Sequence, residues 1–398
     1  MTVPYQTDLY RKVMNKAPVV IDLFCGCGGF GLGAKLAGFD VIAAVDIDTT
    51  LQSAYARNFP NTKIINGDIS LLGESEWNSI VLSKTIDGII GGPPCQGYSR
   101  MGHSDVNDPR RSLLRHFFRT VNIIKPKFFV MENVEGLMDE KNVYELKSAL
   151  KILDAAYQVL DPMIIDASDF GAPTRRRRVV VIGFIPEEFE CGLNSEAFKA
   201  GNHERNTVRN AISDLPAPLM KSKNNDITDF GWHKYRDLKV ENLSKYAKEM
   251  RTLPPKGMGW KNAIDKMKMG EISGFFNTLH SPKVKARYSS IVPGMVDPVS
   301  KSKCLLWDGL CPTLRAGTGS DKGSHQAVRP LHPEEGRVIT VREAARLQGF
   351  PDWFVFHHTK WHSFRMIGNS VSPLMSKHIM GEIYDALNNI ETNAIRVG

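Results

Sequence analysis

Short apolar runs alternate with helix-like segments through the first half of the chain. The runs at 19–24, 41–45, 63–66 and 85–90 have the length and composition of buried strands. The other elements expected in this half are helices at 49–59, 108–124 and 143–157 and strands at 128–131, 159–165 and 179–184. This alternation predicts an α/β protein with a doubly wound, mixed but mostly parallel sheet.

The regular alternation stops at about residue 186 and resumes after 335. The intervening segment is rich in Lys, Asn, Gly, Pro and aromatic residues, which predicts a smaller, irregular domain. After it, Thr340 followed by Glu343 is a capping-box signature that predicts a helix ending before Gly349. A last helix is expected after Pro373. The predicted organisation is therefore one domain over 1–185 that is completed by 336–398, with a second domain over 186–335.

Positive charge is concentrated in the irregular segment. Residues 221–329 hold 20 of the 51 Lys and Arg residues but only 10 of the 43 Asp and Glu residues, as in a surface that binds a polyanion. A lysine-rich solvated surface would give the same count. No apolar run is long enough to span a membrane, and the first residues lack the apolar core of a signal peptide. Six unevenly spaced cysteines indicate reduced thiols in a cytoplasmic protein without a structural metal.

A glycine-rich turn follows the first predicted strand. Gly26, Gly28 and Gly31 fit the Gly-x-Gly-x-x-Gly pattern, and Asp46 follows about 20 residues later. The pattern is typical of a site for an adenosine-bearing cofactor, and NAD, FAD and S-adenosylmethionine all satisfy it. In a doubly wound sheet, ligands bind beyond the carboxyl ends of the strands, where Phe24, Asp46, Asp68 and Cys95 are expected to gather.

Cys95 lies in a stiff turn, Gly91-Gly92-Pro93-Pro94-Cys95-Gln96-Gly97-Tyr98-Ser99, at the end of the fourth predicted strand. Such a turn either presents the thiol as a nucleophile or buries an inert cysteine. Glu132 ends the next predicted strand and is expected at the same edge of the sheet. Four arginines at 175–178 enter a later strand, where alternation places Arg176 and Arg178 on one face. The polar segment 98–111 is a candidate lid.

Taken together and in order, these motifs resemble those of the DNA (cytosine-5)-methyltransferases of bacterial restriction-modification type. The resemblance covers nearly all of the chain outside 186–335. It rests on six motifs, which are 22-DLFCGCGG-29, 93-PPCQ-96, 132-ENV-134, 175-RRRR-178, 342-REAARLQGFP-351 and 368-GNSV-371. The resemblance implies the S-adenosylmethionine-dependent methyltransferase fold, with a target recognition domain at 186–335. Amino-methyltransferases with a similar sheet have an aromatic residue where Cys95 stands, so methylation of carbon is implied.

The resemblance also implies a role for each motif. Cys95 would add to C6 of a flipped-out cytosine in duplex DNA, Glu132 would assist at N3, and Arg178, supported by Arg176, would contact O2. The residues implied to bind S-adenosylmethionine are Phe24, Gly26, Gly28, Gly29, Asp46, Ile47, Asp68, Ile69, Pro94, Leu113, Asn369 and Ser370. Those implied to bind the DNA substrate are Gln96, Ser99, Thr313 and Arg315. Asp46, Ile47 and Thr174 replace a frequent Glu, aromatic residue and Gln of the family.

Three other functions remain open at this point. One branch of the family methylates cytosine in tRNA, a nicotinamide oxidoreductase would also satisfy the glycine pattern, and a non-catalytic DNA-binding relative would keep the fold. The presence of both Cys95 and Glu132 argues against the last. A monomer bound to DNA in the bacterial cytoplasm is expected, and the resemblance allows a restriction endonuclease that acts on the same site. The recognition sequence cannot be read from the chain.

Overall fold

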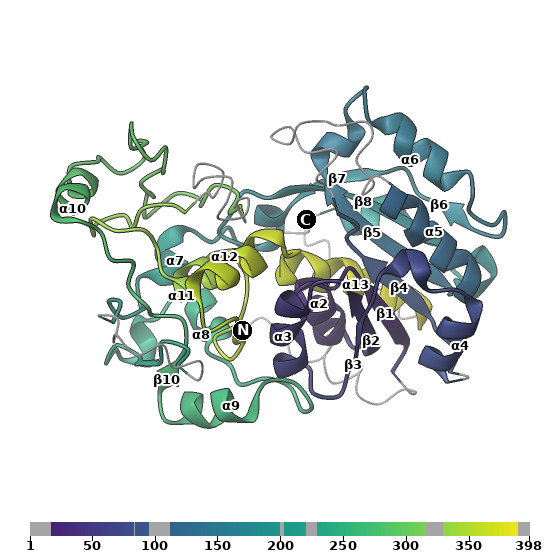
Figure 1. Ribbon diagram of the computed structural model, residues 1–398, viewed down its shortest axis with the longest axis horizontal. Helices are drawn as coiled ribbons and strands as arrows, with labels where there is room; N and C mark the ends of the chain where they lie inside the picture. The colour runs from purple at the N-terminus through teal and green to yellow at the C-terminus, as the bar shows by residue number, and fades with distance from the viewer. Residues whose placement is uncertain are drawn as a thin grey trace, which may run out of the picture.

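The described part of the chain forms two lobes joined across a shared core (Figure 1). The computed structural model describes residues 17–82, 84–94, 112–199, 203–219, 229–315 and 329–388. Within these residues, no helix combines the length and apolar character needed to cross a bilayer.

An eight-stranded sheet organises the first lobe. Its strands are β1 (Val19–Leu23), β2 (Asp40–Asp46), β3 (Lys63–Asn66), β4 (Gly88–Gly91), β5 (Phe128–Val134), β6 (Gln158–Val159), β7 (Met163–Asp166) and β8 (Arg177–Phe184). The order is β3-β2-β1-β4-β5-β8-β6, and β7 also pairs with β8. The first five strands are parallel, whereas β8 runs antiparallel to β5, β6 and β7. The predicted mixed, mostly parallel sheet is confirmed.

Helices cover both faces of this sheet. On one face lie α2 (Gly29–Ala37) and α13 (Pro373–Leu387), and on the other α4 (Glu74–Val81), α5 (Leu113–Ile124) and α6 (Val143–Leu150). Side chains alternate between the two cores along each strand: Val130 of β5 packs in the first core, whereas Phe129 and Met131 pack in the second. Because α13 completes a layer begun by α2, the last described helix belongs to the same lobe as the first described strands.

The second lobe consists of short elements. They are α7 (Val208–Ile212), α8 (Lys245–Met250), α9 (Lys261–Lys268), α10 (Pro282–Ser289) and the two-stranded pair β9 (His233–Lys234) and β10 (Glu271–Ile272). One hydrophobic core joins α7, α8, α9 and β10 to α3 (Thr49–Asn58) and α11 (Val341–Gln348) of the first lobe, through residues such as Tyr55, Met250 and Ala344. The irregular composition of 186–335 therefore corresponds to short elements that pack against the sheet domain.

Some boundaries differ from those predicted. The single strand expected at 159–165 is two short strands, because Pro162 lies between them and has no N–H to donate. The helix expected to reach Tyr157 ends at Leu150, where Asn122 bonds the turn through Ile152 O and Asp154 N. The sequence reasoning also missed α4 and α12 (Lys360–Asn369). The helix with Thr340 as its cap is confirmed, with Glu343 completing the capping box.

Candidate active site

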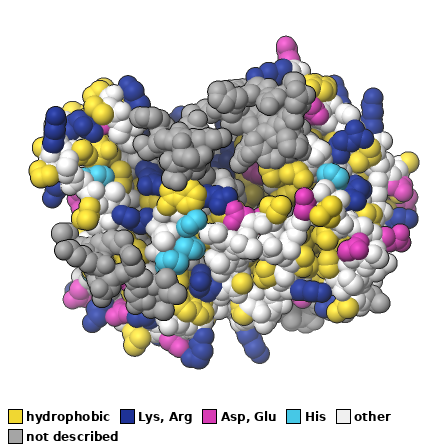
Figure 2. All heavy atoms as spheres, in the orientation of Figure 1, with side chains coloured by type: hydrophobic (Ala, Val, Ile, Leu, Met, Phe, Trp, Pro, Cys, Tyr) yellow, Lys and Arg dark blue, Asp and Glu magenta, His cyan; other side chains and the backbone are white. Residues whose placement is uncertain are grey.

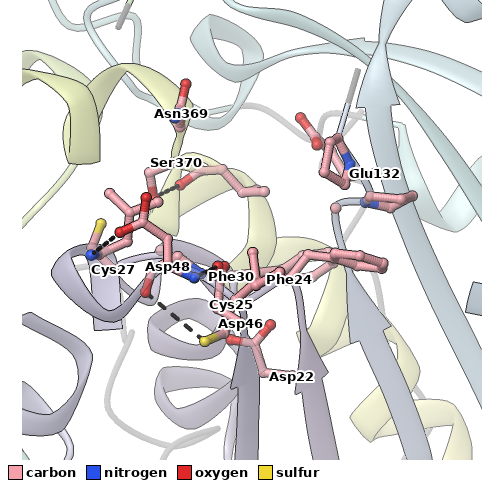
Figure 3. A pocket seen from close by; sticks show the side chains of 18 of the residues that line it. Asp22, Phe24, Cys25, Cys27, Phe30, Asp46, Asp48, Glu132, Asn369 and Ser370 are labelled. Carbon is pink, nitrogen blue, oxygen red and sulfur yellow. Dashed lines mark hydrogen bonds between the residues drawn. The ribbon is translucent and has the colours of Figure 1, made fainter. Parts of the chain in front are cut away.

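A cavity of about 670 Å³ opens where β1, β2, β4 and β5 end. Figure 3 shows Glu132 on one side of it and Asn369 and Ser370 on the other, with Asp22 and Asp46 below. Parallel strands deliver their carboxyl ends to one edge, so residues at or just after the ends of all five parallel strands line the cavity. The cavity joins a carboxylate-lined pocket to a cluster of Glu and Arg side chains.

The turn between β1 and α2 forms the floor of the pocket. Phe24, Gly26 and Gly28 all adopt positive φ, which favours glycine at the latter two positions. Gly26 and Gly29 line the cavity, and a Cβ on Gly29 would collide with Ser370. Gly28 does not line the cavity. A Cβ there would meet Tyr55 and Phe59, so the structure accounts for this glycine by close packing of the turn on α3.

Two aspartates lie at the ends of β1 and β2. The Asp46 carboxylate accepts hydrogen bonds from Gly26 N and Asp48 N, both at 2.8 Å, which fixes it beside the glycine turn. Burial raises its pKa above the ordinary value, against the effect of those two N–H groups. Asp22 is fully buried, and burial raises its pKa to about 8, although Tyr55 Oη donates to Oδ2 at 3.1 Å. Within the described residues, Asp22 Oδ1 has no hydrogen-bond partner.

The remaining wall of the pocket is a mixture of apolar and polar groups. Asp68 caps a short 3₁₀ turn by accepting from Ser70 N at 2.9 Å, and backbone and side-chain hydrogen bonds from Ser70 lower its pKa. Ile69 is buried behind it, whereas Ile47 is largely exposed at the rim. All of the predicted cofactor residues except Gly28 line the cavity. They are Phe24, Gly26, Gly29, Asp46, Ile47, Asp68, Ile69, Pro94, Leu113, Asn369 and Ser370.

Glu132 and Arg178 form an ion pair at the other end of the cavity. Arg178 Nε lies 2.7 Å from Glu132 Oε1, and both side chains are largely shielded from solvent. The predicted alternation is confirmed: Arg176 and Arg178 line the cavity, whereas Arg175 and Arg177 are exposed. Arg177 pairs outside with Glu135 at 3.0 Å. Arg176 and Arg178 therefore face the cavity, whereas Arg175 and Arg177 face solvent.

Arg176 connects this cluster to the end of α12 (Lys360–Asn369). It is fully buried, and its Nη1 donates to Gly368 O at 3.1 Å, directly before Asn369. Asn133 Nδ2 donates to Pro93 O at 3.2 Å and so attaches the proline turn to β5. Cys95, Gln96 and Ser99 lie outside the described residues, as does 98–111, and their assignments stay predictions.

The two predicted DNA contacts of the second lobe do not line the cavity. Thr313 and Arg315 lie on a segment that runs beside the start of β8. Thr313 Oγ1 donates to Arg175 O at 2.6 Å, and Arg175 N donates to Cys311 O at 2.9 Å. The structure thus places this segment next to the arginine strand without bringing it into the pocket.

Sequence reasoning did not assign several polar residues that line the cavity. They are Asp22, Asp48, Ser70, Ser112, Asn133 and Arg365. Arg365 pairs with Asp48 across the rim. Asp22 and Asn133 lie inside the quoted motifs, so position at a strand end was a usable signal for both. Arg365 belongs to α12, which was not predicted.

Comparisons with known proteins match this fold and site. The family model for C-5 cytosine-specific DNA methylase matches residues 19–385. The chain is 39% identical over 374 residues to type II methyltransferase M.XorII of Xanthomonas oryzae pv. oryzae, covering 93% of this chain and 85% of that protein. It is 32% identical to type II methyltransferase M.DdeI of Desulfomicrobium norvegicum, with 93% and 89% covered.

Solved structures agree. A candidate DNA modification methyltransferase encoded within an E. coli prophage is 40% identical with a TM-score of 0.82, and the match covers 94% of this chain and all of that one. The S. pombe Dnmt2 methyltransferase, at 16% identity and a TM-score of 0.56 with 94% and 99% covered, shares the fold.

Fold and pocket together define an S-adenosylmethionine-dependent methyltransferase. The chain belongs to the family of C-5 cytosine-specific DNA methylases, and it transfers a methyl group from S-adenosylmethionine to C5 of cytosine in DNA. These relatives support DNA over the tRNA alternative.

The pocket has the chemistry that S-adenosylmethionine requires. Apolar surface from Phe24, Ile69 and Leu113 suits the adenine ring, and the fixed carboxylate of Asp46 suits hydrogen-bond donors such as ribose hydroxyls. Each Asp46 oxygen accepts one backbone N–H and keeps a second lone pair for a ligand. The cavity volume falls in the ordinary range for ligand sites of roughly 300–1,000 Å³.

Proposed function

We propose that this enzyme methylates one cytosine in a specific duplex sequence through a covalent bond from Cys95. The observation that carries the proposal is the Glu132–Arg178 pair at one end of a cavity whose other end has the groups for S-adenosylmethionine. Pro93 and Pro94 line the same cavity and lead directly to Cys95 in the sequence. The target base would flip out of the duplex to enter the cavity.

C5 of cytosine is too weak a nucleophile to take a methyl group directly, so the enzyme must first add its own nucleophile at C6. The Cys95 thiolate adds to C6, and the electron pair of the C5–C6 double bond becomes available at C5. The protonated carboxyl of Glu132 donates a hydrogen bond to N3 and so stabilises this addition, while Arg178 holds Glu132 and contacts O2. When bound, S-adenosylmethionine would supply an electrophilic methyl group to C5, and the bond from that methyl to the sulfonium sulfur would break so that S-adenosylhomocysteine leaves. A base then removes the C5 proton, and the returning electron pair expels the Cys95 thiolate.

Arg176 is proposed to support this arrangement. Its bond to Gly368 O holds the end of α12 against the start of β8. The chain therefore positions the cofactor residues Asn369 and Ser370 relative to Glu132 and Arg178 through one buried side chain.

Residues 186–335 are proposed as the target recognition domain, with 1–185 and 336–398 as the catalytic domain. The excess of Lys and Arg over 221–329 supports binding of duplex DNA. Thr313 and Arg315 of this domain, with Gln96 and Ser99, are the proposed DNA contacts, and 98–111 is the proposed lid. The enzyme is proposed to act as a monomer in the bacterial cytoplasm, on nucleoid DNA. Its relatives named type II methyltransferases support pairing with a restriction endonuclease for the same site.

Trapping on duplex DNA that contains 5-fluorocytosine tests the mechanism. The fluorine cannot leave as the C5 proton does, so we expect an adduct that resists denaturation, requires S-adenosylmethionine and is absent in Cys95→Ala. The control is Cys191→Ala, at an exposed cysteine outside the cavity, which should trap as the wild type does. An adduct that persists in Cys95→Ala contradicts the proposal. Sequencing of methylated product gives the recognised site.

A further inference from the structure

A hairpin at residues 292–306, here called the recognition hairpin, follows α10 in the chain. Its two arms are hydrogen-bonded in antiparallel fashion: Gly294 N donates to Cys304 O at 2.9 Å and Cys304 N to Met295 O at 2.8 Å. Asp297 N donates to Ser302 O at 2.8 Å nearer the tip, where Lys301 takes a positive φ. The arms therefore form a short two-stranded ribbon.

The base of the recognition hairpin is anchored. Cys304 is buried in a small core with Tyr288 of α10, Leu331 and Val338. Leu305 N donates to Leu331 O at 3.0 Å, and Leu331 N donates to Lys303 O at 2.9 Å. A ribbon fixed at its base presents its tip at little entropic cost on binding.

The outer side chains of the hairpin are apolar and solvent-facing. Val292 is 66% exposed, Met295 61% and Val299 60%, and Val296 and Leu306 are nearly half exposed. Such clustering on a surface marks an interaction site, whereas single exposed apolar residues are ordinary. In Figure 2 hydrophobic and basic side chains lie together over the part of the surface that holds α10 in Figure 1.

The charges around this apolar surface select its partner. Residues 279–306 contain five Lys and Arg residues and one acid, Asp297. That acid is fully buried, with Arg287 Nε at 2.9 Å and Ser300 N at 2.6 Å. Lys283, Lys285 and Lys301 are exposed. Residues 279–306 therefore present cations and apolar groups, and the exposed carboxylates beside them, Asp308 and Glu334, bond Arg209 and Trp307 Nε1. Such a surface complements a polyanion with apolar groups inside a groove.

We propose that the recognition hairpin enters the major groove of the substrate duplex and reads thymine methyl groups with Met295 and Val299. This rests on the proposed function of 186–335. The major groove admits a two-stranded ribbon, and the thymine methyl is the apolar group that it displays. Lys283, Lys285 and Lys301 lie where they can neutralise flanking phosphates. The recognised site therefore contains at least one A·T pair.

The first test compares matched methionine variants. Met295→Ala with Val299→Ala should raise the Kd for the recognised duplex about tenfold, the scale of one lost base contact, measured by fluorescence anisotropy. Binding to a scrambled duplex and to S-adenosylmethionine should not change. The control is Met269→Ala, since Met269 is 66% exposed in the same lobe but near α9, at the opposite end in Figure 1.

The second test removes the methyl group from the DNA. Each thymine of the recognised site is replaced by deoxyuridine, which keeps every hydrogen bond. At least one replacement should raise the Kd of the wild type by a similar factor. The same replacement should leave the Kd of the double variant unchanged. This pairing assigns the effect to a contact between the hairpin and that methyl group.

Other outcomes overturn the proposal. They are a recognised site without an A·T pair, uracil duplexes bound as tightly as thymine duplexes, or a double variant that binds like wild type. A double variant that is monomeric in light scattering where the wild type is dimeric, with unchanged Kd, assigns the surface to self-association. Failure of wild-type trapping on 5-fluorocytosine duplexes contradicts the proposed function instead, so the two failures are distinguishable.

Discussion

At the scale of single residues, the Glu132–Arg178 pair is the sharpest candidate for catalysis. Glu132→Gln keeps an acceptor for Arg178 Nε but loses the acidic proton that the mechanism uses at N3. We expect the single-turnover methylation rate to fall by roughly 10²–10⁴-fold, the contribution of a general acid–base group, with the Kd for S-adenosylmethionine unchanged. The measurement is rapid-quench methyl transfer to duplex DNA.

Glu135→Gln is the matched control for this variant. Glu135 pairs with Arg177, whose side chain is more than half exposed, on the outer side of the same strand pair. Exposed pairs contribute little, so this variant should methylate at nearly the wild-type rate. Equal losses in the two variants would assign Glu132 a structural role only.

Asp22 predicts a pH dependence of stability. Its pKa is raised to about 8 by burial, whereas an unfolded chain releases this proton near pH 4. Between these values the folded state holds more protons, so the free energy of unfolding falls as pH rises, by at most about 1.4 kcal/mol per pH unit. Asp22→Asn mimics the protonated form and should remove this slope, as measured by urea unfolding at intervals from pH 4 to 8.

A second variant tests the same cause from the other side. Tyr55 Oη donates to Asp22 Oδ2, and this bond lowers the pKa of Asp22 against the effect of burial. Tyr55→Phe should therefore extend the falling slope to higher pH. Identical slopes in wild type and Asp22→Asn would show that Asp22 does not titrate in this window.

At the scale of elements, the start of β8 is where the two lobes meet near the site. Thr313 Oγ1 donates to Arg175 O, one residue before Arg176 and three before Arg178. Thr313→Val removes that bond, which is worth about 1 kcal/mol, so we expect kcat to fall roughly fivefold. Thr313→Ser keeps the hydroxyl and should restore kcat. Steady-state methylation and the Kd for S-adenosylmethionine, expected unchanged, check this.

These measurements distinguish an effect of Thr313 on the catalytic arginine strand from a simple loss of contact between Thr313 and DNA. A change confined to the KM for DNA, with kcat as in the wild type, would show that Thr313 acts on DNA alone. A Ser variant as impaired as the Val variant would show that the hydroxyl is not the relevant group.

The elements also show what the sequence could predict. Runs such as 19–24 and 41–45 were predictable as strands because buried parallel strands are continuously apolar. The helix start at Thr340 was predictable because the capping box with Glu343 depends on local sequence alone. The 292–306 hairpin has neither the apolar period of a helix nor the alternation of a half-buried strand. Its pairing depends on an anchor at Leu331, which is distant in the sequence. The raised pKa of Asp22 depends on burial by groups from α2 and α3, which no spacing reveals.

At the scale of the whole molecule, a buried ion cluster joins the lobes. Arg346 of α11 is fully buried and donates to Asp352 at 2.6 and 2.7 Å and to Asp214, just after α7, at 3.1 Å. Asp214 also accepts from Arg251, just after α8, at 2.6 Å. These bonds lie within the hydrophobic core shared by both lobes. We therefore expect calorimetry of the wild type to show one unfolding transition rather than two.

Arg346→Leu tests how far this cluster holds the lobes together. The variant leaves Asp352 and Asp214 buried without their shared cation, and removing one partner of a buried pair costs about 3–5 kcal/mol of unfolding free energy. Because the core is shared, the loss should lower the single transition instead of splitting it. Arg209→Leu breaks an exposed pair with Asp308 and should unfold like the wild type. Two separated transitions in Arg346→Leu would mean that the cluster, and not the apolar core, makes the lobes unfold together.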